Sequence, residues 1–169
     1  MGSSPGAKRG DVELFNNFVQ DPMPKKSGSG STYEIENGLI LVQDTSVTPS
    51  VLKISGVGSS GPHYMSRGAR VKITDDYILS DNGTVLAALD TDKVVSAVKS
   101  GRVLLEFTNE CTPTDRVMTD NGKVKKYDGS GQDKIVGTYR HKPGEGDGKS
   151  LPSVITAGQL GWVDLGEGR

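Results

Sequence analysis

The sequence predicts an all-β protein, built as a small sandwich or barrel, and three observations favour this class. Its 169 residues include 23 glycines and 8 prolines, which interrupt regular structure and favour turns. Only 33% of the residues are hydrophobic and 5% are aromatic, so long amphipathic helices are not expected. From Tyr33 to Leu165, short apolar and β-branched runs alternate with turn residues, which is typical of β sandwiches and barrels.

Residues 1–34 are expected to form an extended, flexible N-terminal arm. Its first ten residues and the tract 25–32 are small and polar, and Gly/Ser tracts bury too little surface to offset their chain entropy. Between them, apolar residues recur at i, i+1, i+4 and i+5, which predicts a short helix capped by Asp11 and ended before Pro22. A helix this short is marginal alone, so its apolar stripe is expected to dock on the protein's own core or on another subunit. The stripe consists of Leu14, Phe15, Phe18 and Val19.

The β domain is expected to span residues 35–169, with a first strand that begins just before it. Strands are predicted where apolar residues alternate with polar ones, or where β-branched residues cluster between turns. Residues 92–99 would also fit a short helix, but their three valines favour a strand. The predicted strands are 33–36, 38–42, 51–55, 69–73, 77–79, 84–89, 93–95, 102–107, 123–127, 134–139, 153–155 and 161–165.

A faint internal repeat would divide this domain into two similar halves, about 35–110 and 111–169. Asp-Asn-Gly occurs at residues 81–83 and again at 120–122, and Asn-Gly favours a type I′ hairpin turn because both central residues need positive φ. After each hairpin we expect a strand, a glycine turn (at Gly101 or Gly158) and a further strand. Chance likeness among glycine-rich strands is the alternative explanation.

Charge and cysteine content argue against several classes of function. The chain has 20 Lys and Arg against 21 Asp and Glu, so a basic nucleic-acid-binding surface is not expected. The apolar runs are too short to span a bilayer, and the first residues do not lead into the apolar region of a signal peptide. Cys111 cannot form an internal disulfide, and His63 and His141 alone cannot supply a structural zinc site. Cys111 is expected to be a small, partly buried residue in a reduced compartment, and no cofactor is expected.

Two glycine-rich motifs resemble phosphate-binding loops, but neither has room for the helix that such a loop needs. Residues 56–61 match G-x-G-x-x-G after a strand, yet Pro62 and the next strand follow too soon, so a mobile Gly/Ser loop is expected. Residues 144–150 lack the first glycine of the motif, because Pro143 stands there, and Pro152 blocks the helix. This second segment is expected to be a solvated loop tip.

Side chains that could carry chemistry have simpler structural explanations. Asp128 and Asp133 flank a turn that could hold a calcium ion, but the spacing is not that of an EF-hand. A turn stabilised by local Asp and Ser hydrogen bonds is favoured there. Glu106, Glu110 and Asp115 could serve a small hydrolase, although carboxylates at strand ends are usually only solvated.

The end of the chain has a distinctive order of elements. A strand ending in Tyr127 leads into Asp128-Gly129, a strand containing Val136-Gly137 follows, and a late strand is led by Gly158. Residues 117–165 resemble, in this order, the head decoration proteins of tailed bacteriophages, the lambda-like family with a small β-tulip fold. The resemblance covers less than a third of the chain, which departs from the family by its extra strands at 33–107 and by an inserted loop at 141–151.

The resemblance implies a β-tulip-like fold and a non-enzymatic capsid accessory, or cement, protein. Such a protein is made in the host cytoplasm and ends up on the outer surface of the virion. It binds the major capsid protein as a trimer, and N-terminal arms add strands to the capsid lattice. In this chain the partner-binding residues would be the arm anchors Leu14, Phe15, Phe18 and Val19.

Other functions remain open from the sequence. A carbohydrate-binding or adhesin-like β module would present Trp162 or Tyr139 on an aromatic face, whereas in the simpler interpretation these residues anchor a small core or a subunit contact. Another minor virion structural protein would share most of the same features. A hydrolase would need at least two converging carboxylates.

Overall fold

The computed structural model describes residues 7–13, 19–25, 32–34, 38–45, 51–67, 72–74, 77–79, 85–88, 93–146, 148 and 150–168. These residues contain thirteen strands and one short 3-10 helix, η2 (Gln132–Lys134), but no α-helix. The all-β prediction is therefore confirmed.

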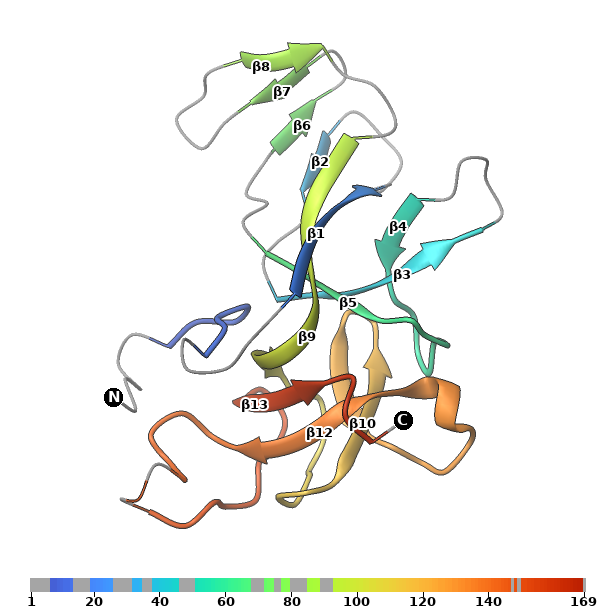
Figure 1. The fold of residues 1–169 in the computed structure, drawn as a ribbon. Helices are drawn as coiled ribbons and strands as arrows, with labels where there is room; N and C mark the ends of the chain where they lie inside the picture. Colours follow the sequence, from blue (N-terminus) through green and yellow to red (C-terminus); the bar gives the residue numbers. More distant parts are fainter. Residues whose placement is uncertain are drawn as a thin grey trace.

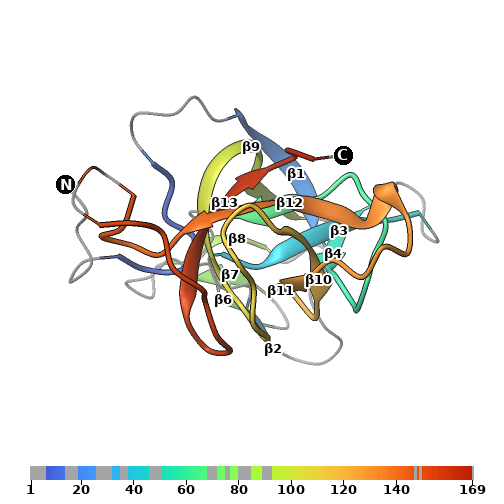
Figure 2. The same ribbon diagram turned by 90° about the horizontal axis from the view of Figure 1, so that it is seen from below.

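Eight strands form one antiparallel, strongly curled half-barrel sheet, and β1 joins them as a ninth strand (Figures 1 and 2). The order across the sheet is β1 (Val19–Lys25), β4 (Val51–Ile54), β3 (Ile40–Asp44), β5 (Tyr64–Ser66), β9 (Lys93–Glu106), β13 (Leu160–Leu165), β12 (Ile135–His141), β10 (Arg116–Asp120) and β11 (Lys123–Lys126). A separate four-stranded sheet, at the top of Figure 1, consists of β2 (Thr32–Glu34), β6 (Lys72–Thr74), β7 (Tyr77–Leu79) and β8 (Val85–Ala88).

The long strand β9 joins the two halves of the nine-stranded sheet, because it lies between β5 and β13. Its first half pairs with β1 and β5, and its second half pairs with β13. The curl brings Phe107, just after β9, to a parallel bridge with Val124 of β11. The predicted glycine turn at Gly101 is wrong, because β9 continues through it with a φ of 117° and pairs on both sides of it. The alternative of a short helix over residues 92–99 is wrong for the described residues 93–99, which belong to β9. Their valines lie in this strand, as expected.

One core cluster draws side chains from both ends of the sheet. Ile40, Met65 and Val98 from the first half pack with residues of the C-terminal strands. Phe107 and Tyr139 form an edge-to-face pair with ring centroids 5.0 Å apart, which is a favoured aromatic geometry. The C-terminal members of the cluster are Val103, Leu105, Phe107, Cys111, Val117, Val124, Val136, Tyr139, Ile155, Val163 and Leu165.

Two described parts of the predicted arm, residues 10–13 and β1, pair with β9, whereas its last part, β2, pairs with β6. Backbone hydrogen bonds join Asp11 to Leu104 and Glu13 to Arg102, so a helix that begins at Asp11 is wrong. Burial of Val12, which is 8% exposed, and the open hydrogen-bonding edge of β9 favour the extended form. Val19 begins β1 opposite Ser100, whereas Leu14, Phe15 and Phe18 lie outside the described residues.

The structure describes one of the two predicted Asp-Asn-Gly hairpin turns. Asn121 and Gly122 have φ values of 51° and 84° between β10 and β11, which confirms the hairpin turn with two positive φ angles. The matching residues 81–83 lie outside the described part of the chain.

The loop at residues 56–61 is hydrogen-bonded to residues of the C-terminal part of the chain. The amide of Gly58 donates to the carbonyl of Thr119 over 3.0 Å, and the amide of Gly61 donates to the carbonyl of Asp133 over 2.7 Å. The Ser60 hydroxyl also donates to the Asp133 carboxylate over 2.6 Å. These bonds fasten the loop to β10 and to η2.

Candidate functional site: the charged outer face of β9, β13 and β12

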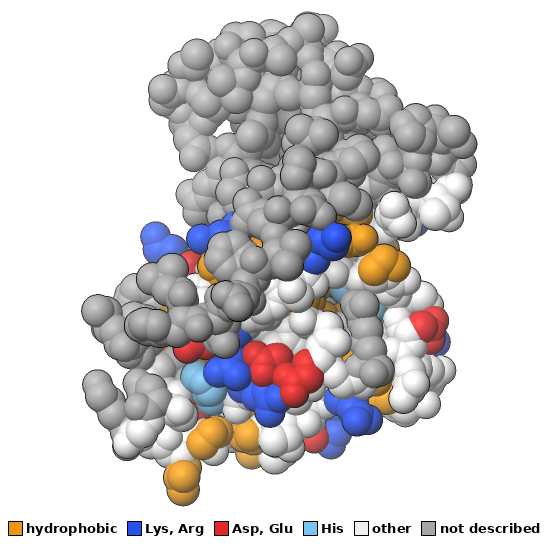
Figure 3. Space-filling model, viewed as in Figure 1, with side chains coloured by type: hydrophobic (Ala, Val, Ile, Leu, Met, Phe, Trp, Pro, Cys, Tyr) orange, Lys and Arg blue, Asp and Glu red, His pale blue; other side chains and the backbone are white. Residues whose placement is uncertain are grey.

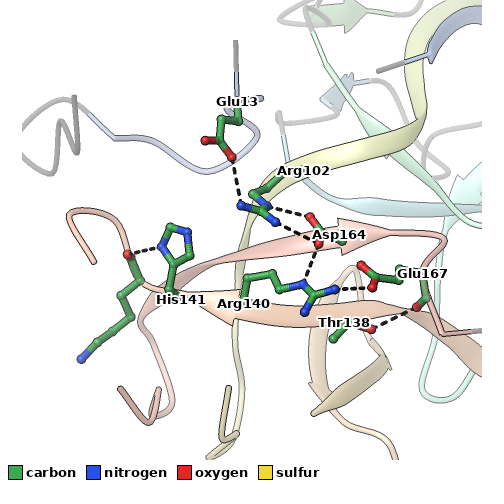
Figure 4. A network of polar contacts seen from close by, with 8 residues as sticks. Glu13, Arg102, Thr138, Arg140, His141, Asp164 and Glu167 are labelled. Carbon is green, nitrogen blue, oxygen red and sulfur yellow. Dashed lines mark hydrogen bonds and ion pairs between the residues drawn. The ribbon is translucent and has the colours of Figure 1, made fainter. Parts of the chain in front are cut away.

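The outer face of the C-terminal sheet carries a network of paired charges (Figure 4). Arg102 of β9 and Asp164 of β13 are direct Cα partners, and Arg140 projects from the neighbouring strand β12. Because successive residues of a strand point to opposite faces, the apolar neighbours Val103, Val163 and Leu165 turn inward while these charges turn outward. Strand alternation therefore explains why the charges gather on this face.

Asp164 is the centre of this network. Its carboxylate accepts hydrogen bonds from Arg102 Nε over 2.7 Å, from Arg102 Nη2 over 3.1 Å and from Arg140 Nε over 2.6 Å. Burial would raise the pKa of Asp164, but these guanidinium hydrogen bonds outweigh it and lower the pKa to about 2. The carboxylate is thus held ionised and fully engaged.

Two segments that lie far apart in the sequence are attached to the same network. Glu13 of the N-terminal region lies 3.4 Å from Arg102 Nη1, and Glu167, just after β13, pairs with Arg140. The hydrogen bond that Arg102 donates to Asp164 raises the pKa of Arg102, and those that Arg140 donates to Glu167 and Asp164 raise the pKa of Arg140. Figure 3 shows acidic and basic side chains side by side on this surface. The arrangement neutralises charge and fastens the segments that carry Glu13 and Glu167 to the sheet.

The carboxylates considered for hydrolysis do not converge among the described residues. Glu106 lies 2.7 Å from Lys123 Nζ and 3.6 Å from Arg9 Nη1. Asp115 accepts a hydrogen bond from the amide of Thr112 over 2.8 Å, and Glu110 is exposed in the loop after β9. Each of these groups therefore has a local structural partner or faces solvent.

The turn at residues 128–133 contains a local hydrogen bond of the kind that the sequence predicts. Asp128 accepts a hydrogen bond from the amide of Ser130 over 2.9 Å, and the hydrogen bonds from Ser130 lower the pKa of Asp128. Asp133 instead accepts the hydroxyl of Ser60. Within the described residues, no group of three or more His, Cys, Asp or Glu side chains is placed to hold a metal ion.

The aromatic and sulfur side chains have separate environments. Tyr139 is fully buried, and its hydroxyl donates to the carbonyl of Ser153 over 2.7 Å. Trp162, by contrast, is half-buried, opposite Leu104 and His141 in the sheet. Cys111 is buried, and burial raises the pKa of its thiol to about 12, which keeps it unreactive. Tyr139 is thus a core residue, as the simpler interpretation expects.

The segment at residues 144–150 belongs to a loop that is organised by Glu145. The Glu145 carboxylate accepts hydrogen bonds from the Ser153 hydroxyl over 2.5 Å and from the amides of Ser153 and Lys142. These hydrogen bonds, against the effect of burial, lower the pKa of Glu145. Leu151 nevertheless stands 88% exposed, so the predicted solvated loop has a fixed base and an exposed apolar residue.

Sequence reasoning missed Arg102, Arg140, Asp164 and Glu145. A charged residue that alternates with buried valines and leucines, such as Asp164 between Val163 and Leu165, signals only that the residue faces outward. Its partners come from other strands, so the network could not be assigned from one segment.

Comparison with known proteins adds no relative. No protein-family model matches the chain, and no curated protein matches it. Among the described residues, no helix has the length and apolar character needed to cross a membrane.

Proposed function

We propose that this protein is a non-enzymatic accessory protein of a tailed-bacteriophage head. It binds the outer surface of the capsid lattice, through the major capsid protein, as a homo-oligomer that is expected to be a trimer. It stabilises the shell by attachment and not by chemistry. The fine architecture proposed for it is the β-tulip-like form of that family, with the N-terminal region as the attachment element.

The observation that carries this proposal is the compactness of the segment that bears the resemblance. The residues from Val117 to Leu165 supply β10, β11, β12 and β13, which are contiguous in the curled sheet. Gly137 of the Val-Gly step lies where a Cβ atom would stand 2.3 Å from the carbonyl oxygen of Asp164. The order of elements that resembles the family is therefore also a packed structural unit, which supports a shared architecture.

The state of the carboxylates supports a structural role over a catalytic one. Asp164 is held by two arginines, Glu106 by Lys123 and Glu145 by Ser153. A general acid or base needs a carboxyl group that can exchange a proton near neutral pH, and the lowered pKa values of Asp164 and Glu145 make these two groups poorly suited to this. The polar face thus serves cohesion of the fold.

The test measures binding to heads with the arm anchors removed. Phe15→Ser with Phe18→Ser is expected to reduce occupancy of expanded empty heads, taken from the phage that carries the chain, by about tenfold, because apolar anchors dominate such contacts. Leu151→Ser is the matched control, since Leu151 is an exposed apolar residue outside the predicted arm and its change is expected to leave occupancy intact. Cosedimentation with heads would quantify both variants.

Two results would count against the proposal. If the unaltered protein does not bind the heads at all, the capsid role is wrong. If it binds and the double serine variant binds equally well, the role survives but Leu14, Phe15, Phe18 and Val19 are not the anchors.

The carbohydrate-binding alternative now depends on fewer residues. Tyr139 is fully buried and its hydroxyl is engaged, so it cannot form an aromatic platform. Trp162 is then the aromatic residue on which a sugar-binding face would depend. Selective binding on a glycan array, lost in Trp162→Ala, would favour that alternative.

A further inference from the structure

The inner part of the N-terminal region, here called the front segment (residues 8–13), occupies one edge of β9. The amide of Gly10 donates to the carbonyl of Leu104 over 2.8 Å, and the amide of Leu104 donates to the carbonyl of Asp11 over 2.9 Å. The amide of Glu13 donates to the carbonyl of Arg102 over 3.0 Å. Since β13 occupies the other edge of β9 at these residues, the front segment completes the hydrogen bonding of this stretch.

Contacts outside β9 also hold the front segment, since Arg67 Nη1 donates a hydrogen bond to the carbonyl of Gly10 over 2.9 Å. Val12 is its member of the core cluster. The ion pairs from Glu13 to Arg102 and from Arg9 to Glu106 have N–O distances of 3.4 and 3.6 Å and are partly exposed, so each stabilises the contact only weakly. Short edge segments of this kind open locally at a cost well below that of global unfolding.

The connection to β1 is longer than the pairing with β9 requires. Val12 pairs with Val103 and Val19 pairs with Ser100, so seven residue steps on one chain face three steps on β9. A continuous ladder would need about 10 Å at about 3.4 Å per residue, whereas seven extended steps reach about 24 Å. The surplus lets the front segment reach beyond its own β9 while β1 stays in the sheet.

We propose that the edge of β9 at residues 102–104 is a strand-acceptor site for the front segment of a second copy of this chain. The occupant is a second copy because an identical segment re-forms the same contacts. These include the three backbone hydrogen bonds, the hydrogen bond from Arg67 to the Gly10 carbonyl, the burial of Val12 and the pairing of Glu13 with Arg102. Exchange between copies then changes only the connecting chain, which is why swapping of a terminal element is a low-cost route to oligomers. This inference does not rest on the capsid role.

The pairing of Val12 with Val103 gives a direct way to detect the exchange. The hydrogen bonds flank this pair and do not join its own members, which is the arrangement with the shorter Cα–Cα distance in an antiparallel ladder. Such closely spaced positions suit a disulfide after substitution by cysteine. All variants carry Cys111→Ser, so that the native thiol takes no part.

The experiment mixes two full-length chains, one with Val12→Cys and the other with Val103→Cys, at high protein concentration in a glutathione redox buffer. A covalent dimer of the two chains can form efficiently only when the front segment of one copy lies on β9 of the other. Mass spectrometry without reducing agent is expected to show this mixed dimer at about ten times the yield of a control mixture, because docking raises the effective thiol concentration. The control mixture replaces Val12→Cys by Thr156→Cys at an exposed position.

A third protein with both Val12→Cys and Val103→Cys in one chain defines the outcomes. It is expected to form the internal disulfide when dilute. If it does so and the mixed dimer does not exceed the control, the exchange is refuted. If it forms no internal disulfide, the docking of the front segment on β9 is itself wrong and the inference fails with it.

Discussion

The C-terminal strands and the front segment share the strand β9 but are held to it by different means. β13 pairs with β9 along six consecutive residues, and its inward side chains belong to the main core. The front segment has three backbone hydrogen bonds to β9, one side chain in the core cluster, one hydrogen bond from Arg67 and partly exposed ion pairs. One strand therefore has a long, core-packed neighbour on one edge and a short one on the other, and three changes would break or sharpen this contrast.

The largest effect is expected from Gly137→Ala in β12. The new Cβ atom would stand 2.3 Å from the carbonyl oxygen of Asp164 and 2.9 Å from Val163 Cγ1, so β12 and β13 would have to separate. We expect the free energy of unfolding to fall by about 3 kcal/mol or more, as severe overpacking does. Urea denaturation followed by circular dichroism would measure the change.

Gly56→Ala is the matched control for this substitution. Its new Cβ atom would meet only the Ser59 hydroxyl oxygen, at an ordinary 3.8 Å, and Gly56 does not have a positive φ. A change within about 0.5 kcal/mol is expected, as for substitutions away from packed features. If both variants lose similar stability, close packing between β12 and β13 is not what requires Gly137.

A pair of identical residues compares the two regions directly. Val12 and Val103 are Cα partners, but Val103 lies in β9 and Val12 in the front segment. We expect Val103→Ala to cost about 2 kcal/mol and Val12→Ala about 1 kcal/mol or less, because local opening of the front segment limits the second loss. Amide hydrogen exchange should show faster exchange of Leu104 in Val12→Ala, and equal global losses would contradict the contrast.

The smallest effect is expected from Asp164→Asn, which weakens the network that joins the two regions. Because this network is partly exposed to solvent, we expect a loss of about 1 kcal/mol at neutral pH. The folded-state pKa of Asp164, about 2, is below its ordinary value of 3.8, so its stabilisation is present above about pH 4 and is lost as the pH falls towards 2. The unfolding free energy of Asp164→Asn should show a smaller drop over that window, and an unchanged drop would assign it to other carboxylates.

Local features of the fold could be predicted from the sequence. The hairpin turn at Asn121 and Gly122 requires two positive φ angles, and Asn-Gly is the dipeptide that best tolerates them. The strand character of residues 93–99 followed from their valines. The local hydrogen bond between Asp128 and the amide of Ser130 followed from the short spacing of polar residues.

Features that depend on distant partners could not be predicted. The stripe at residues 14–19 has helical spacing, but the residues just before it are extended because the edge of β9, about ninety residues away in the chain, offers hydrogen bonds. The sequence predicts a helix that ends before Pro22, yet Pro22 and Pro24 lie within β1. Their positions two residues apart place both missing N–H groups on one side of the strand, so the other side can still pair. The partners of Asp164 and Glu145 were likewise hidden, since they come from separate elements.

The position of β9 has a consequence for how the molecule unravels. Without β9, the strands β1 and β5 would lose a pairing partner on one side of the sheet, and β13 would lose one on the other. Neither half of the sheet is therefore complete without β9. The strands of the curled sheet are accordingly expected to melt together, in a single calorimetric transition whose van't Hoff and calorimetric enthalpies agree.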